Sequence, residues 1–112
     1  MPSHAELASK LLKDAATFFR TLASQNRNIE KQMTDNANVF EKISNLVIQD
    51  PYGKLDDTPH AVLAGRLLKD AAGFFRKLGE QNQPIQDQMN ENANVYDQMG
   101  DLVMQNPLGI LD

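Results

Sequence analysis

Apolar side chains recur every three or four residues along four stretches of the chain, which is the spacing of one face of an α-helix. In the first stretch, Leu7, Leu11 and Leu22 lie on a broad arc, with the small residues Ala8 and Ala15 near its middle. An arc of this width suits a helix that contacts two neighbours. The pattern therefore predicts four helices, over about residues 4–24, 28–49, 59–79 and 84–105.

Short sequence signals frame the predicted helices. Ser3 and Glu6 fit a capping box, in which each side chain binds a backbone N–H group that the first turn leaves free. Thr58 followed by Pro59 fits an N-cap with proline at the first helical position. Asp50 and Asn106 also precede prolines, and there the proline disfavours helical backbone angles and ends the helix. Residues 51–57 are thus expected to form a short linker.

The second half of the chain repeats the first. Residues 4–56 align with residues 60–112 without a gap, and 30 of the 53 aligned pairs are identical. The block LLKDAATFFRTL, which begins at Leu11, returns as LLKDAAGFFRKL from Leu67. A two-helix unit has an apolar face that it cannot cover alone, whereas two such units can cover each other.

We therefore expect an all-α fold in a single domain over residues 1–112. The repeat units 4–56 and 60–112 are predicted to form two tandem homologous helix-loop-helix hairpins, packed as a four-helix bundle about a pseudo-two-fold axis. One continuous core is expected from large apolar residues of both units. These residues are Leu11, Phe18, Met33, Phe40, Leu67, Phe74, Met89 and Tyr96.

The composition excludes several classes of site. The chain has no cysteine, which excludes disulfides, thiolate zinc sites and cysteine nucleophiles. No uninterrupted apolar run approaches the roughly 20 residues that a transmembrane helix needs. The first residues lack the basic and apolar stretches of a secretory signal. These features favour a cytoplasmic protein without a transmembrane segment.

The charges are distributed unevenly between the helices. The net charge of −4 disfavours a general nucleic-acid binder, because binding to phosphates needs a positive surface. The first and third helices are nevertheless basic on their exposed faces, while the fourth carries only acidic charges. Neighbouring helices of opposite sign most simply fit each other electrostatically. The alternative is a basic stripe that meets an acidic partner or an anionic surface.

Four amides fall in the middle of the apolar arcs of the even-numbered helices. They are Gln32 and Asn36 in the first unit, with Gln88 and Asn92 as counterparts in the second. A buried amide costs free energy unless its hydrogen bonds are made. We therefore predict that these side chains are buried and fix the register of the hairpins, as a single buried Asn does in coiled coils. The alternatives are that they line a small polar pocket for a ligand, or that they are simply exposed at the rim of the arc.

Several polar residues on the exposed faces are identical in both units. They are candidates for an interaction surface: Lys13, Arg20, Asn38, Lys69, Arg76 and Asn94. The competing interpretation of the arginines is structural, with the aliphatic stem packed on the helix and the charged head in water.

The two histidines, His4 and His60, occupy matching places at the starts of the odd-numbered helices. In a two-fold bundle they could approach each other and supply half of a metal site. However, the Glu-x-x-His pattern of di-iron bundles is absent, so packing at the helix start is favoured. The sequence has no Ser-His-Asp constellation and no glycine-rich phosphate loop. We therefore expect no enzyme activity, no cofactor and no bound metal.

The sequence favours a non-enzymatic helical module for protein–protein interaction or structure. Its partner would be an unidentified protein or a second copy of the chain. A second hypothesis is a bundle that binds a small ligand or a metal through His4, His60, Asn36 and Asn92. A third and weaker hypothesis is binding to an anionic surface through the basic helices.

Overall fold

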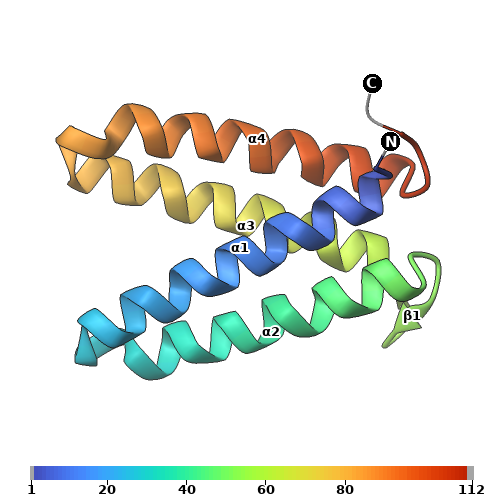
Figure 1. Ribbon diagram of the computed structural model, residues 1–112, viewed down its shortest axis with the longest axis horizontal. Coiled ribbons are helices and arrows are strands. Elements are labelled where there is room, and N and C mark those ends of the chain that lie inside the picture. Colours follow the sequence, from blue (N-terminus) through green and yellow to red (C-terminus); the bar gives the residue numbers. More distant parts are fainter. Residues whose placement is uncertain (1, 111–112) are drawn as a thin grey trace.

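The computed structural model describes residues 2–110, which form four α-helices joined by short turns (Figure 1). The first hairpin consists of α1 (His4–Gln25) and α2 (Glu30–Gln49), and the second of α3 (His60–Gln81) and α4 (Gln86–Gln105). The predicted all-α four-helix bundle is therefore confirmed. Its boundaries lie within about two residues of those predicted, because the capping and proline signals act locally.

Short elements connect the helices. One 3₁₀ turn precedes each even-numbered helix, namely η1 (Arg27–Ile29) and η2 (Gln83–Ile85). Between the hairpins, β1 (Lys54–Leu55) and β2 (Thr58–Pro59) pair antiparallel. The predicted N-cap at Thr58 is therefore wrong, because Thr58 lies in β2 and Pro59 holds the N-cap position of α3 without a side-chain hydrogen bond. Every helix boundary in the second hairpin lies 56 residues after its counterpart in the first. The matched boundaries follow the 56-residue repeat of the sequence.

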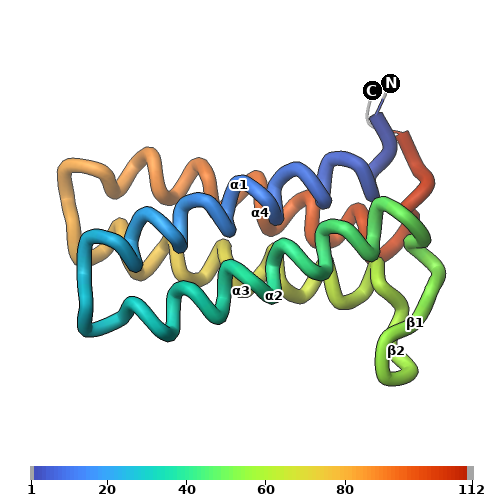
Figure 2. Tube along the Cα trace, turned by 60° about the horizontal axis from the view of Figure 1, so that its bottom comes forward, coloured from blue at the N-terminus to red at the C-terminus, as the bar shows by residue number. Residues whose placement is uncertain are grey.

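The odd-numbered helices lie at the centre of the bundle. Helices α1 and α3 contact each other and cross in the middle of the molecule (Figure 1). Helix α2 packs on α1 and α3, while α4 packs on α3 and α1. Figure 2 shows that the linker between the hairpins lies at the same end of the bundle as the start of α1 and the end of α4. The even-numbered helices thus form the outer sides.

An aromatic cluster joins the hairpins in the core. The ring of Phe18 makes an edge contact with Phe75 at 5.5 Å between ring centroids, and Phe19 makes the matching contact with Phe74 at 5.4 Å. Phe19 and Phe75 are buried, whereas Phe18 and Phe74 are half-buried beside them. The core is thus continuous across both hairpins, but its predicted membership is only partly right. Met33, Phe40, Met89 and Tyr96 are buried, whereas Leu11, Phe18, Leu67 and Phe74 are half-buried at its edge and their chain neighbours Leu12, Phe19, Leu68 and Phe75 are buried instead.

Small side chains let the helices of each hairpin approach closely. In the first hairpin, Ser9 Oγ donates a hydrogen bond to the Ser44 carbonyl at 2.9 Å, and both residues are buried. Glycines hold the matching positions in the second hairpin. A Cβ atom built on Gly65 would lie only 2.8 Å from the carbonyl oxygen of Gly100. This spacing explains why no larger residue stands there.

Candidate functional site

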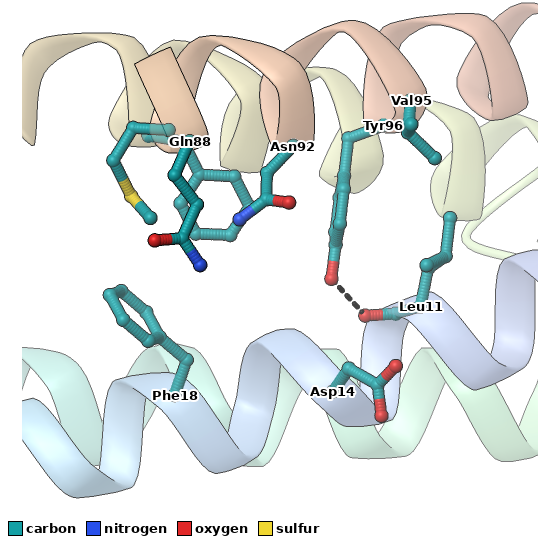
Figure 3. A pocket seen from close by; sticks show the side chains of 9 residues that line it. Leu11, Asp14, Phe18, Gln88, Asn92, Val95 and Tyr96 are labelled. Carbon is teal, nitrogen blue, oxygen red and sulfur yellow. Dashed lines mark hydrogen bonds between the residues drawn. The ribbon is translucent and has the colours of Figure 1, made fainter. Parts of the chain in front are cut away.

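Two matching grooves lie where the hairpins meet, within residues 2–110. The α1–α4 groove has a volume of about 390 Å³, and the α2–α3 groove has a volume of about 280 Å³. The α1–α4 groove, drawn in Figure 3, is lined by Leu11, Asp14, Phe18, Phe75, Gln88, Met89, Asn92, Val95 and Tyr96. The α2–α3 groove is lined by Phe19, Asn36, Val39, Phe40, Leu67, Asp70, Ala71 and Phe74. All of these except Ala71 are repeat counterparts of residues in the first groove.

Helical spacing builds the walls of the α1–α4 groove. Gln88, Asn92 and Val95 stand four and three residues apart on α4, so they follow one side of the helix. On α1, Asp14 and Phe18 form the opposite wall with the same spacing. The repeat sequence therefore produces the same groove a second time.

Polar groups face one another across the α1–α4 groove. Figure 3 shows the amides of Gln88 and Asn92 on α4 opposite the carboxylate of Asp14 on α1. The hydroxyl of Tyr96 donates a hydrogen bond to the carbonyl of Leu11 at 2.8 Å, which ties α4 to α1. Burial, with a smaller contribution from the negative charge of Asp14, raises the pKa of Tyr96. The phenol therefore stays a neutral donor at physiological pH.

The prediction that the four amides are buried is wrong. Gln32, Gln88 and Asn92 are exposed, and Asn36 is only half-buried. These amides therefore have no need to fix the register of the hairpins, because an amide in contact with water does not need a hydrogen-bond partner in the protein. Asn36 and Asn92 each line one of the two open grooves instead.

The cause of this error lies in small residues. The face of α2 that is packed against α1 is centred on Ala37 and Ser44, both fully buried. Neither residue contributes much to an apolar pattern, whereas the exposed Val39 does. The large side chains alone form an arc centred on Asn36. At about 100° per residue, this arc is rotated by roughly 90° from the line of Ala37 and Ser44. The same displacement occurs in α4 around Ala93 and Gly100.

The two candidate arginines link the helices within their own hairpins. Arg20 on α1 forms an ion pair with Glu41 and donates a hydrogen bond to Asn38 Oδ1 at 3.1 Å, both on α2. In the second hairpin, Arg76 donates the matching bond to Asn94 at 3.0 Å. Both asparagines lie on the exposed side of the helices, as the sequence predicts. The arginine heads are therefore engaged in bridges between helices as well as being in contact with water.

The candidate lysines differ between the hairpins. Lys69 lies 2.8 Å from Asp101 and 4.0 Å from Asp97 on α4, and Arg76 lies 2.7 Å from the same Asp97. The hydrogen bond to Asp101 raises the pKa of Lys69. Its counterpart Lys13 is exposed on α1. The opposite signs of α3 and α4 thus serve their mutual packing, the simpler of the two interpretations of the charge pattern.

The histidines occupy the same end of two odd-numbered helices. His4 Nδ1 lies 2.8 Å from the carbonyl of Asn106, and His60 Nδ1 lies 2.8 Å from the carbonyl of Asp50. Both side chains are buried, and each donates its Nδ1 proton to the end of an even-numbered helix. In the part of the chain that the structure describes, no three His, Cys, Asp or Glu residues gather as metal ligands.

Sequence reasoning missed Asp14 and Asp70 as groove residues, together with the exposed Val39 and Val95. All four are identical between the units, and that identity is the signal that could have found them. The sequence does not show that a helix of one hairpin and a helix of the other line the same groove.

Comparison with protein-family models, with curated proteins and with solved structures finds no match for this chain. Within residues 2–110, no helix combines the length and apolar character needed to cross a membrane. The two grooves are therefore the features from which function is inferred.

Proposed function

We propose that this chain is a non-enzymatic interaction module that binds a segment of another protein in its two grooves. The observation that supports this proposal is the recurrence of one groove, with matched lining residues, at two places on the bundle. Two equivalent sites on a rigid bundle suit a partner that presents two similar side chains. Such two-point binding is tighter than binding at either point alone.

The apolar walls indicate the first part of the partner's chemistry. Val95 and Val39 are 49% and 48% exposed at the edges of their grooves. Phe18 and Phe74 are half-buried beside them. Covering such side chains removes apolar surface from water, which is the main driving force of most protein–protein association. The partner should therefore insert apolar groups.

The polar groups of the grooves indicate that the partner is also basic. Each groove carries one carboxylate, Asp14 or Asp70, and one asparagine whose amide oxygen can accept a hydrogen bond. Carboxylates form their strongest hydrogen bonds with Lys and Arg, whose long stems also pack on apolar walls. The net charge of −4 attracts a basic partner. An amphipathic segment with basic residues beside apolar ones fits both grooves.

The competing hypotheses have less support. Asn36 and Asn92 line separate grooves, and the imidazoles of His4 and His60 are bonded to backbone carbonyls, so these residues do not converge on one ligand. Binding to an anionic surface would draw on basic side chains that already bridge helices, such as Arg76.

A peptide selection tests the proposal. Random peptides displayed on phage are selected against the full chain, and their affinities are measured by calorimetry. We expect the selected peptides to combine Lys or Arg with apolar residues. The double variant Asp14→Asn, Asp70→Asn should weaken their binding about tenfold or more, because each groove loses a charge-assisted hydrogen bond.

Two further variants complete the test. Asp35→Asn combined with Glu80→Gln removes the same charge from exposed positions outside the grooves and should leave affinity within about twofold. Asn36→Lys combined with Asn92→Lys places a long cationic side chain in each groove. Peptides that bind this filled variant as tightly as the original chain, or a selection that enriches no peptide, would overturn the proposal.

A further inference from the structure

The two hairpins meet at a corner where the chain passes from one to the other. At this linker corner, residues 50–61, the backbone N–H of His60 donates to the carbonyl of Gly53 at 2.7 Å. The N–H of Ala61 donates to the carbonyl of Pro51 at 3.1 Å, and His60 Nδ1 lies 2.8 Å from the carbonyl of Asp50. The end of α2 thereby satisfies the free N–H groups at the start of α3.

The same set of bonds occurs at a second corner that the chain does not pass through. At this terminal corner, residues 3–5 meet residues 106–110, and the N–H of His4 donates to the carbonyl of Gly109 at 2.8 Å. The N–H of Ala5 donates to Pro107 at 2.9 Å, and His4 Nδ1 lies 2.8 Å from the carbonyl of Asn106. Each partner stands 56 residues from its counterpart at the linker corner.

The strand pairing is matched as well. Lys54 pairs with Pro59 at the linker corner, and their counterparts Ile110 and Ser3 form an antiparallel bridge at the terminal corner. The corners thus differ mainly in one respect, which is that a covalent turn closes the linker corner. The terminal corner makes the same contacts without that turn. A corner of this kind does not need both of its segments to be neighbours along one chain.

The covalent turn is the strained part of the linker. Asp56 and Asp57 connect the paired strands β1 and β2, and they have positive φ angles of 50° and 65°. Both angles lie in the left-handed region, which residues other than glycine rarely adopt, although aspartate and asparagine enter it more readily than other side chains. A two-residue turn of this type is most often formed by Asn-Gly. Opening the turn relieves this strain and leaves the corner contacts to be made by another segment.

We propose that the chain exchanges hairpins with a second copy of itself. In the exchanged dimer, the first hairpin of one copy packs on the second hairpin of the other. The two opened linkers run antiparallel, so that Lys54 of each copy pairs with Pro59 of the other. Every contact between hairpins is retained, because the same surfaces meet. The α1–α4 and α2–α3 grooves are retained too, so one dimer carries each groove twice.

The test uses the full chain with a disulfide that reports which hairpins are paired. The variant Ser3→Cys, Ile110→Cys places one cysteine on each side of the bridge at the terminal corner, in a chain that has no other cysteine. Within one copy the disulfide is intramolecular, whereas in an exchanged dimer it joins two copies. Deleting residues 56 and 57 in this variant makes the tight turn impossible. We expect a covalent dimer of twice the 12.5 kDa chain mass on a non-reducing gel.

The matched control replaces the turn with a favourable one. Asp56→Asn with Asp57→Gly, in the same cysteine background, should hold the chain as a monomer with an internal disulfide. A folded deletion variant whose disulfide stays within one copy would overturn the proposal. A dimer that falls apart in denaturant without reductant would do the same, since it would be joined only at its surface.

A second measurement keeps the test decisive if the deletion prevents folding. The cysteine variant with the natural turn is unfolded in denaturant and reductant, then refolded and oxidised at low and at high protein concentration. Hairpin exchange predicts that the share of covalently joined copies rises with concentration and that the Asn-Gly control suppresses it. An internal disulfide at every concentration would overturn the proposal.

Discussion

The first and second hairpins share their helix boundaries but bring their helices together with different side chains. In the first, a hydroxyl group fills the space between the helices, where Ser9 binds the carbonyl of Ser44. In the second, Gly65 leaves that space open, and the side chain of Met104 occupies it. The counterpart of Met104 is Ile48, which is 47% exposed. Exchanging Ser for Gly is thus accompanied by a second change that fills the gap.

This difference shows which positions determine the backbone. The residues that form the centre of both hairpins, such as Ala37 and Ala93, are identical in the two units and fully buried. The positions next to them differ between the hairpins in compensating pairs, as Ser9 with Ile48 is replaced by Gly65 with Met104. The helix boundaries therefore survive substitutions that are compensated locally, and the predictions below test where that compensation ends.

The largest expected effect lies in the aromatic cluster that the hairpins share. Phe19→Ala and Phe75→Ala should each cost about 3–5 kcal/mol in the free energy of unfolding, because both rings are buried at 3% and 4% exposure. Phe18→Ala and Phe74→Ala should cost at most about half as much, since water already reaches those rings. Urea unfolding measures all four. Unequal costs for Phe19 and Phe75 would show that the hairpins do not share the cluster evenly.

The next largest effect on stability differs between the two hairpins. Gly65→Ala should cost about 1–3 kcal/mol, because the new Cβ would meet Met104 and the carbonyl of Gly100. Ser9→Ala at the matching position should change stability by less than about 1 kcal/mol, since the lost hydrogen bond is offset by better helix propensity. Thermal melts followed by circular dichroism give both values. Equal costs would mean that the helices of the second hairpin can move apart.

A smaller effect concerns Tyr96, whose counterpart is Phe40. Tyr96→Phe should lose about 0.5–1.5 kcal/mol at neutral pH, because the hydrogen bond to Leu11 disappears. The pKa of Tyr96 is raised in the folded chain, so above about pH 10 the unfolded chain releases the phenol proton while the folded chain keeps it. The hydroxyl therefore favours unfolding increasingly as the pH rises.

The expected result is a crossing pattern in unfolding curves measured between neutral and alkaline pH. Stability of the original chain should fall faster above about pH 10 than that of Tyr96→Phe. Parallel pH profiles for the two proteins would show that the hydroxyl ionises as freely in the folded state as in the unfolded chain.

The smallest effect is a gain. Asn45→Asp gives the first hairpin the acidic residue that Asp101 supplies in the second, within reach of Lys13 as Asp101 is of Lys69. An exposed pair of this kind should add about 0.2–1 kcal/mol at low ionic strength and nearly nothing at about 1 M salt. Denaturant unfolding at the two salt concentrations measures the gain. A gain that persists at high salt would point to helix packing as its cause.

The helices were predictable from the sequence because their signals are local. The capping box of Ser3 with Glu6 is present in the structure, and the residues before the prolines end the even-numbered helices as expected. The repeat also made the pairing of two hairpins predictable. These conclusions need only the pattern along the chain and no knowledge of how one hairpin faces the other.

The grooves and corners were less predictable because they depend on distant contacts. The hydrogen bond between His4 and the Asn106 carbonyl joins residues 102 positions apart, and no local sequence pattern predicts it. The prediction that the amides are buried was wrong for another reason. Ala37 and Ser44 are fully buried, but they contribute little to the apolar face of a helical wheel. Small residues at a close helix contact therefore mislead an interpretation based on large ones.

The aromatic cluster has a consequence for how the two grooves respond to occupation. Phe18 forms part of one groove and Phe74 part of the other, and their rings are in edge contact at 6.4 Å between centroids. A side chain that displaces Phe18 must therefore press on the wall of the second groove. We expect occupation of one groove to change the affinity of the other, which calorimetric titration of the chain with a single-groove variant as reference would measure.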